Sequence, residues 1–463
     1  MDLIVAEETV KEKVNLAESI LDKCFNMLLD IKHATESLGK AIVEFQPLLA
    51  DCLLALMEFY HELQGEKKIF ISQKETYSPD EFAICMQSNA KHLKIIGECI
   101  KIGKSLGDAF AWFFYHKNRA ELDMHLEHPS TGLFPSGIGG KGELAFIKNN
   151  QNLDGLFVVY HGITDMLRIG DFSLYAGNSG IVGVGELKTI QEGDHLKVSA
   201  NITSKVNISA PEDAEKEAVA FPEKVKELAQ SFPQLPKQLE LQDKVVGTKS
   251  LRPSSNHYAD YEYYLIDSIS PENPVILNKD NSLLICAIWS SFTSLYRVLS
   301  TTETVNTPPG LSDAVLTLMK PESPYNSATL SELDLRLFPP RMPILWWKID
   351  DRKCKDIYFK RVSISTVFNP AKLLQRFLDE GFCVSCFGRV QDIKLERDKD
   401  GKRIEFGHMQ MFCDMISQSL MTTDAVFSMI QEIVKNFESG AVQPGTKVDM
   451  HIHLNNFGTM PDE

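Results

Sequence analysis

Apolar residues at three- and four-residue steps dominate the first 125 positions, which is the spacing of amphipathic helices. Between about residues 7 and 64 they include Val10, Val14, Leu21, Phe25 and Leu28. A second helix is predicted to start at Ser78, because serine can cap a helix and Pro79 fits its first turn. We therefore predict a helical domain over residues 1–125, with the aromatic run 110–115 in its core.

The pattern changes near residue 126, where Pro, Ser and Gly gather in a loop. A short helix is predicted from Lys141. Strand-like runs rich in Val, Ile, Leu and Tyr follow at 156–160, 166–175 and 180–189. Residues 205–245 are Glu-, Lys- and Pro-rich and expected to be mostly helical, and the apolar run 283–289 is typical of a buried strand. The order helix, three strands, helix, strand defines a central region, 126–300, with a helical insertion near 205–245.

Residues 301–463 form a third region of mixed pattern. The runs 344–349 and 357–362 are predicted strands, and Asn369-Pro370 starts a helix that Gly381 ends. A hairpin is predicted to turn at 398–401. This region is expected to be an α+β domain without an assigned role, so the fold class of the chain is α/β and α+β multidomain.

The segment 170–189 has the pattern of a β-hairpin that brings two carboxylates together. A tight turn centred on the Asn-Ser pair within 177–180 would set Asp171 directly opposite Glu186. Side chains alternate along a strand, so Lys188 shares the face of Glu186. Opposed like charges destabilise a sheet unless a cation offsets them, and carboxylate oxygens suit a hard divalent ion. This register predicts a metal site, which a shift by one residue would abolish.

This arrangement resembles the PD-(D/E)XK nuclease superfamily, whose core runs helix, three strands, helix, strand. That family carries an acid on the second strand and Glu-x-Lys on the third. The resemblance covers the middle region and assigns Asp171 to the acid, and Glu186 and Lys188 to the Glu-x-Lys. The family's first helix often supplies another acid, a place that Glu143 occupies. Before the second-strand acid the family usually has proline, where this chain has Gly170.

The resemblance implies a restriction-endonuclease-like αβββαβ core and a Mg²⁺- or Mn²⁺-dependent endonuclease. In that mechanism Asp171 and Glu186 hold the metal, which activates a bound water. Lys188 orients this water and stabilises the developing negative charge. Glu143 joins the coordination sphere through a water or completes a second metal site.

The same resemblance favours DNA over RNA as the substrate and is typical of restriction or phage-defence effectors. His195 and Lys197 follow the Glu-x-Lys strand, and we expect them to contact the phosphate backbone; an ordinary surface loop is the alternative. The helical N-terminal region is expected to supply a surface for a protein partner or for homo-oligomers.

Composition limits these expectations. The 463 residues are 43% hydrophobic and 24% charged, as in globular proteins of two to four domains. The net charge of −15 excludes a chain-wide basic surface, so nucleic-acid contact is confined to a local patch. The sequence shows no secretory signal or membrane-spanning run, and its nine scattered cysteines suit a reducing compartment. We therefore expect a cytoplasmic protein without a membrane partner.

Two alternatives stay open at this point. Asp171 and Glu186 are also interpretable as solvent-facing strand residues, with Lys188 as an ion-pair partner that contributes little to stability. For the whole protein, the alternative is a non-catalytic interaction or scaffold protein with a degenerate nuclease-like domain. Metal binding distinguishes an intact catalytic site from both.

Overall fold

In the computed structural model, the described residues are 7–115, 122, 125–126, 137–177, 179–192, 195–204, 261–301, 307–320, 327–333, 342–385, 393–399, 402–406 and 409–439. The chain divides into two units. Unit 1 contains the described residues up to 204 together with 292–301, and unit 2 contains the remainder. The helix expected near 205–245 lies outside the described residues.

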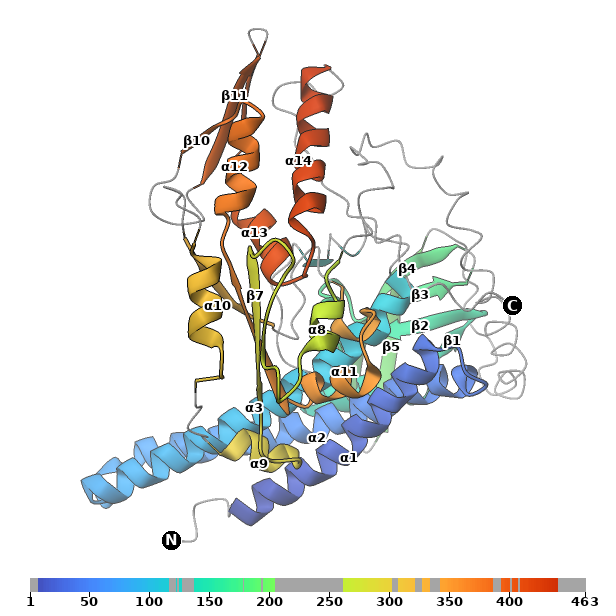
Figure 1. Cartoon of the computed structure of the whole chain (residues 1–463). Helices are drawn as coiled ribbons and strands as arrows, with labels where there is room; N and C mark the ends of the chain where they lie inside the picture. Colours follow the sequence, from blue (N-terminus) through green and yellow to red (C-terminus); the bar gives the residue numbers. More distant parts are fainter. Residues whose placement is uncertain are drawn as a thin grey trace. The chain divides into compact units, whose positions relative to one another are not determined.

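Unit 1 begins with three long helices that lie side by side (Figure 1). They are α1 (Glu7–Lys32), α2 (Leu38–Ser72) and α3 (Pro79–Tyr115), with the 3₁₀ helix η1 (Lys74–Thr76) before α3. A capping box starts α3: Ser78 donates to the Glu81 carboxylate, and the Glu81 N–H donates to Ser78 Oγ. The predicted helical region is confirmed. Among the described residues, no helix combines the length and the apolar run needed to cross a membrane.

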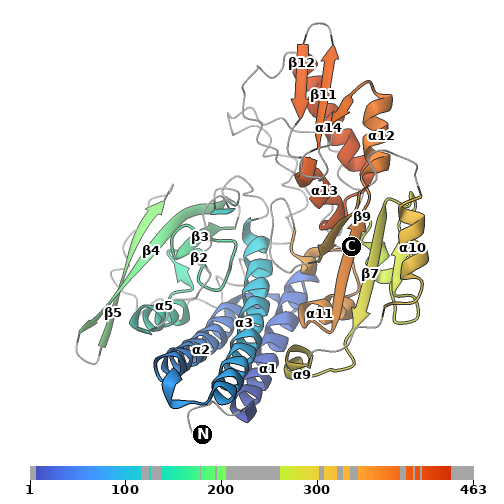
Figure 2. The same ribbon diagram turned by 90° about the vertical axis from the view of Figure 1, so that its left-hand side faces the viewer.

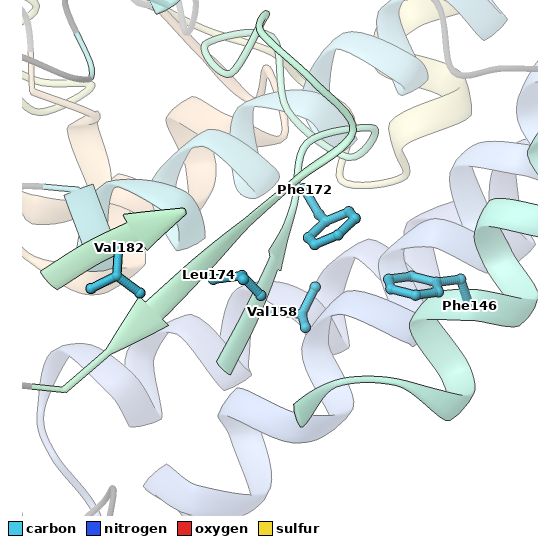
Figure 3. Close-up of a cluster of buried hydrophobic side chains, with 5 residues drawn as sticks. All are labelled: Phe146, Val158, Phe172, Leu174 and Val182. Carbon is cyan, nitrogen blue, oxygen red and sulfur yellow. The ribbon is translucent and has the colours of Figure 1, made fainter. Parts of the chain in front are cut away.

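A helix and a five-stranded antiparallel meander complete the main part of unit 1. They are α5 (Gly137–Asn149), β1 (Asn152–Leu153), β2 (Leu156–Tyr160), β3 (Phe172–Ala176), β4 (Gly180–Glu192) and β5 (His195–Ser204). Phe146 of α5 packs on Val158, Phe172, Leu174 and Val182 in one core cluster (Figure 3). The strand predicted at 156–160 is confirmed as β2, whereas no strand was predicted at the position of β5.

The other face of the sheet packs against α3. Phe114 stacks on Phe157 of β2 with ring centroids 5.0 Å apart, and it meets the Tyr175 ring edge-on. Phe110, Phe114 and Tyr115 are all buried, which confirms that the aromatic run is core. The sheet therefore lies between α5 and α3.

One buried side chain joins α2 to the edge of the sheet. The Gln46 amide donates to the Val158 carbonyl (2.8 Å) and accepts from the Tyr160 N–H (2.7 Å). It thereby satisfies backbone groups of β2 that the two-residue strand β1 does not reach. The boundary predicted near residue 126 therefore does not separate two bodies, because the helices and the sheet form one unit.

Unit 2 contains two smaller sheets, with strand orders β6-β7-β9-β8 and β10-β11-β12. Its elements are α8 (Tyr264–Ser268), β6 (Val275–Leu277), β7 (Leu283–Trp289), α10 (Leu311–Leu318), β8 (Thr329–Glu332), η4 (Ile344–Trp346), α11 (Asp351–Tyr358), β9 (Val362–Phe368), α12 (Ala371–Asp379), β10 (Cys383–Ser385), β11 (Lys394–Lys399), β12 (Lys402–Phe406), α13 (Met409–Ser417) and α14 (Thr423–Glu438). The chain is thus a mixed helix-and-sheet protein with an N-terminal helical region.

The pairing of β7 shows that the predicted bounds of the central region, 126–300, are wrong. The strand β7 is the buried strand that the apolar run indicated, but it pairs along its whole length with β9 rather than with the sheet of unit 1. Conversely, α9 (Leu295–Ser300) follows β7 in the sequence and packs on α1 and α3. There the Leu295 N–H donates to Glu18, and the Tyr296 hydroxyl donates to Glu7. The span 126–300 is therefore not one domain.

Predictions for the C-terminal region are mixed. The helix α12 and the β11–β12 hairpin are confirmed, and Gly381 follows α12 at φ +81° as a helix end requires. The run predicted as a strand at 344–349 contains the 3₁₀ helix η4 instead. The run at 357–362 is divided between α11 and β9, because Asp350 caps a helix there by accepting from the Lys353 N–H.

A substitution in α3 tests how closely this helix approaches the β2–β3 connection. A Cβ atom at Gly107 would lie 1.9 Å from the Ile163 carbonyl oxygen, so Gly107→Ala forces the helix and the connection apart. We expect the free energy of unfolding to fall by about 1–3 kcal/mol, measured by denaturant titration. Gly97→Ala is the matched control, because the nearest atom to its Cβ, in Tyr60, is 3.9 Å away. Equal stability of the two variants would contradict the close approach.

Candidate active site

The register between β3 and β4 sets the geometry of the predicted site. Phe172, Ser173 and Leu174 pair with Gly185, Val184 and Gly183, as the expected register requires. Nearer the turn, however, Tyr175 pairs with Ile181 and Ala176 with Gly180, one residue out of step. The predicted two-residue turn is therefore wrong. The extra residue of β4 is taken up at a bulge beside Leu174, and this restores the register at the site.

Asp171 lies immediately before β3 and is held beside β4. Its N–H donates to the Gly185 carbonyl (2.8 Å), and its Oδ2 accepts from the Leu187 N–H (2.6 Å). Gly170 precedes it at φ +70°, an angle that proline, locked near −65°, cannot adopt. The departure from the family's usual proline thus has a backbone cause. Asp171 reaches the Leu187 N–H from this turn.

Glu186 and Lys188 are exposed on β4, at positions that share one face. Their partners on β5 are Asn201 and Ser199. Burial raises the pKa of the Asp171 carboxyl and Glu186 adds to the increase, while the Leu187 N–H opposes it. The structure therefore brings Asp171 and Glu186 close enough to repel each other, with Lys188 two positions along the same strand.

Of the two residues expected to touch phosphate, Lys197 is exposed and pairs with Ile190. His195 pairs with Glu192 at the far end of the β4–β5 hairpin. Both belong to the strand β5 and not to a surface loop, so that alternative is wrong.

Glu143 is buried on α5 and accepts a hydrogen bond from the Tyr160 hydroxyl. Burial raises the pKa of its carboxyl to about 7, and Asp171 adds to the increase; the Tyr160 hydrogen bond and Lys104 oppose it. Glu143 is therefore an electrostatic neighbour of Asp171. Its carboxylate is nevertheless engaged by Tyr160.

The carboxylates available to a cation at this position are those of Asp171 and Glu186. Across the described residues, no three His, Cys, Asp or Glu side chains gather in a metal-binding group. Asp171 and Glu186 offer two mutually repelling carboxylates, and Mg²⁺ commonly uses only one or two from the protein while keeping several waters. Glu143 is not grouped with these two acids, and its Oε2 accepts from the Tyr160 hydroxyl.

Two buried charges on α3 hold the β2–β3 connection that leads to Asp171. The Lys104 ammonium donates to the carbonyls of Gly162 (2.8 Å) and Thr164 (3.0 Å). The Asp108 Oδ1 accepts from the N–H groups of Asp165 (2.8 Å) and Met166 (2.9 Å). Burial raises the pKa of Asp108 to about 7, with Asp165 adding to the increase. These contacts fix the connection.

A chain of four buried side chains, which begins at Tyr115 of α3 and His125, holds the part of the connection nearer Asp171. Backbone N–H groups of Arg168 and Ile169 both donate to His125 Nδ1, so this nitrogen carries no proton. The Gly170 carbonyl can only accept, so His161 Nδ1 carries the proton between them. Both histidines are therefore neutral, with opposite tautomers.

The protonation of His125 and His161 sets the direction of each hydrogen bond between them. His125 Nε2–H donates to the Tyr115 hydroxyl (3.2 Å), which donates to Ser173 Oγ (2.5 Å). Ser173 in turn donates to His161 Nε2 (2.7 Å). Every member is buried and satisfied, so the chain orients the backbone on either side of Asp171.

The roles of Lys104, Asp108, Tyr160 and the two histidines were not predicted from the sequence. One signal was present: Lys104 and Asp108 lie one helical turn apart, on the buried stripe of α3 that continues to Tyr115. Charged residues at core positions are rare unless they are paired. His125 and His161, in contrast, come from segments whose proximity only the folded chain reveals.

No protein-family model, curated protein or solved structure matches this chain.

His161 is expected to make stability depend on pH. Burial, together with a smaller contribution from His125, lowers the pKa of its imidazole from 6.5 to about 3. Between these pH values the unfolded chain holds a proton that the folded chain lacks. The free energy of unfolding should therefore fall as the pH drops from 6.5 toward 3, by up to about 1.4 kcal/mol per pH unit. Denaturant titrations of the wild type and His161→Gln at about pH 7 and about pH 5 measure this loss.

The stability advantage of the wild type over His161→Gln should narrow at the lower pH, because glutamine does not titrate. Ser173→Ala breaks the same chain but keeps the imidazole, so its stability should change with pH as that of the wild type does. An advantage of equal size at both pH values would contradict a neutral, buried His161.

Proposed function

We propose that this chain is a metal-dependent nuclease that hydrolyses phosphodiester bonds, with DNA favoured over RNA. The observation that carries the proposal is the juxtaposition of the Asp171 and Glu186 carboxylates, with Lys188 two residues beyond on the same strand. The order of α5, β2, β3 and β4 also supports it, since it follows the first four elements of the PD-(D/E)XK core. A restriction or phage-defence role belongs to the same proposal.

In this proposal each site residue has a separate task. Asp171 and Glu186 hold Mg²⁺ or Mn²⁺, which when bound polarises the phosphate and lowers the pKa of a coordinated water. The Leu187 N–H fixes Asp171 through Oδ2. The Lys188 ammonium orients the attacking water and stabilises the charge that develops on the phosphate.

The rigidity of the β2–β3 connection supports this assignment. Catalytic groups have to be held close to their productive geometry, and contacts around them supply that restraint. Asp171 follows a connection whose backbone is held by Lys104, Asp108 and the histidine chain. We infer that these residues position Asp171 without touching the substrate.

Specific contacts also favour a second candidate, an interaction protein with a degenerate site. Asp171 has a structural role through Leu187, and Glu143 has one through Tyr160. Neither contact requires a metal. In this alternative the fold is retained, and a surface of the helical region binds a protein partner or another copy of the chain.

The lysine of the site gives the first test. Lys188→Ala should reduce metal-dependent cleavage of linear and circular DNA by about 100-fold or more, because it removes the charge that stabilises the transition state. DNA binding in EDTA should stay within about tenfold of wild type, because the variant loses at most one phosphate contact. Lys94→Ala removes an exposed lysine of α3 and serves as the control. Cleavage by Lys188→Ala at the wild-type rate would contradict the assignment.

The charge of Asp171 gives the second test. Without metal, Asp171→Asn should be at least as stable as wild type, because its amide oxygen still accepts from Leu187 and the repulsion by Glu186 is gone. With Mg²⁺ or Mn²⁺, the wild type should melt at a higher temperature, since a ligand of the folded state stabilises it. Asp171→Asn should lose this shift.

Asp154→Asn is the matched control, because Asp154 is exposed in the β1–β2 turn. It should keep the full metal-induced shift. An equal shift in Asp171→Asn and wild type would place the metal elsewhere, and no shift in the wild type would favour the non-catalytic alternative.

A further inference from the structure

The strands β4 and β5 continue beyond the rest of the sheet as a two-stranded ribbon. β4 pairs with β3 only as far as Gly185, but it pairs with β5 as far as Glu192. Residues 186–192 and their partners 195–201 therefore extend past β3 by roughly 20 Å. Figure 2 shows β4 and β5 reaching beyond β2 and β3. We call these two segments the ribbon.

One face of the ribbon is covered by α5. Leu187 and Val198 lie on this face and pack against the core of unit 1. Gly142 of α5 lies against Thr189 so closely that a Cβ atom there would be 2.1 Å from the threonine hydroxyl. The ribbon is thus supported from behind by a helix.

The other face of the ribbon is open. It carries Glu186, Lys188, Ile190, Lys197, Ser199 and Asn201, all of them exposed. Ile190 is 56% exposed. Lys197 is its cross-strand partner on β5, and Lys188 precedes it by two residues on β4. The face therefore combines two ammonium groups, a hydroxyl and an amide around one apolar side chain, and the Glu186 carboxylate lies at its end next to Asp171.

We propose that the open face of the ribbon binds duplex DNA in the major groove, which brings a backbone phosphate to Asp171 and Glu186. The position of the duplex relative to these acids rests on the proposed nuclease function. The major groove, about 12 Å wide, admits a two-stranded β-ribbon. Lys197 contacts phosphate, and Ile190 contacts the floor or wall of the groove.

The composition of this face argues for a duplex over a single strand. Proteins that bind single strands stack the bases on aromatic side chains, and none of the six residues of the open face is aromatic. Duplex RNA is disfavoured as well, because its major groove is deep and too narrow for side chains to read. Among nucleic acids, the composition of the open face therefore favours the major groove of a DNA duplex.

The test is fluorescence anisotropy with a short labelled DNA duplex, one of its single strands and the matching RNA duplex, all in EDTA. Wild type should bind the DNA duplex at least about tenfold more tightly than the other two. Ile190→Asp should weaken duplex binding by about tenfold or more, because it sets a carboxylate against phosphates. Lys197→Ala should reduce the salt dependence of binding by about one counterion.

Ile84→Asp is the matched control, because Ile84 is a similarly exposed isoleucine, 63% accessible, on α3. It should bind the duplex like wild type, and thermal melting should show both Asp variants folded. Duplex binding by a folded Ile190→Asp at wild-type strength would overturn the proposal. So would equal or tighter binding of the single strand or the RNA duplex, or no binding of any of them.

These outcomes distinguish failure of the ribbon proposal from failure of the nuclease proposal. Because binding is measured in EDTA, it depends on neither metal nor cleavage. If Ile190→Asp loses duplex binding while wild type never cuts DNA with Mg²⁺, the ribbon proposal stands and the nuclease proposal fails. If wild type cuts but Ile190→Asp binds and cuts equally well, the reverse holds.

Discussion

Two buried charges on one turn of α3 determine where the candidate site can form. Lys104 and Asp108 satisfy four backbone groups of the connection before Asp171. A buried charge without partners destabilises a protein by several kcal/mol, so α3 and this connection have to fold together. Gly107 provides the space for that approach. This constraint explains why the helical region and the sheet form one unit, whereas the sequence pattern predicted two domains.

The positions of the two carboxylates also depend on how β3 and β4 pair near their turn. The register at Asp171 would be wrong if the out-of-step pairs beside the turn continued along β3. The bulge beside Leu174 absorbs the extra residue, and Val182 fills the core beneath it. The register of Phe172 to Leu174 is therefore the expected one, although the turn is not, and Asp171 itself precedes the paired strand with its N–H bonded to the Gly185 carbonyl. A hairpin register has to be checked at each end of the strand.

Local features were predictable from the sequence and distant ones were not. The Ser78–Glu81 capping box and the strand Leu156–Tyr160 follow from residues within a few positions of each other. The partner of β7 depends on long-range packing, since the same apolar run fits a central strand of either sheet. Within the site, strand alternation alone predicts that Glu186 and Lys188 lie on one face of β4. The contacts that hold Asp171 span 40 residues or more, from Lys104 and His125, and leave no periodic signal.

The charge of Asp171 is the strongest argument for a cation at this site. Its structural task, accepting the Leu187 N–H, needs only a carbonyl oxygen of the right reach, and an asparagine supplies one. The carboxylate adds two costs, partial burial and repulsion by Glu186, both of which raise its pKa. The hydrogen bond from the Leu187 N–H offsets these costs only in part, since the pKa of Asp171 stays raised. In the proposed function, a divalent cation between Asp171 and Glu186 offsets both costs, which is the physical reason for proposing a metal there.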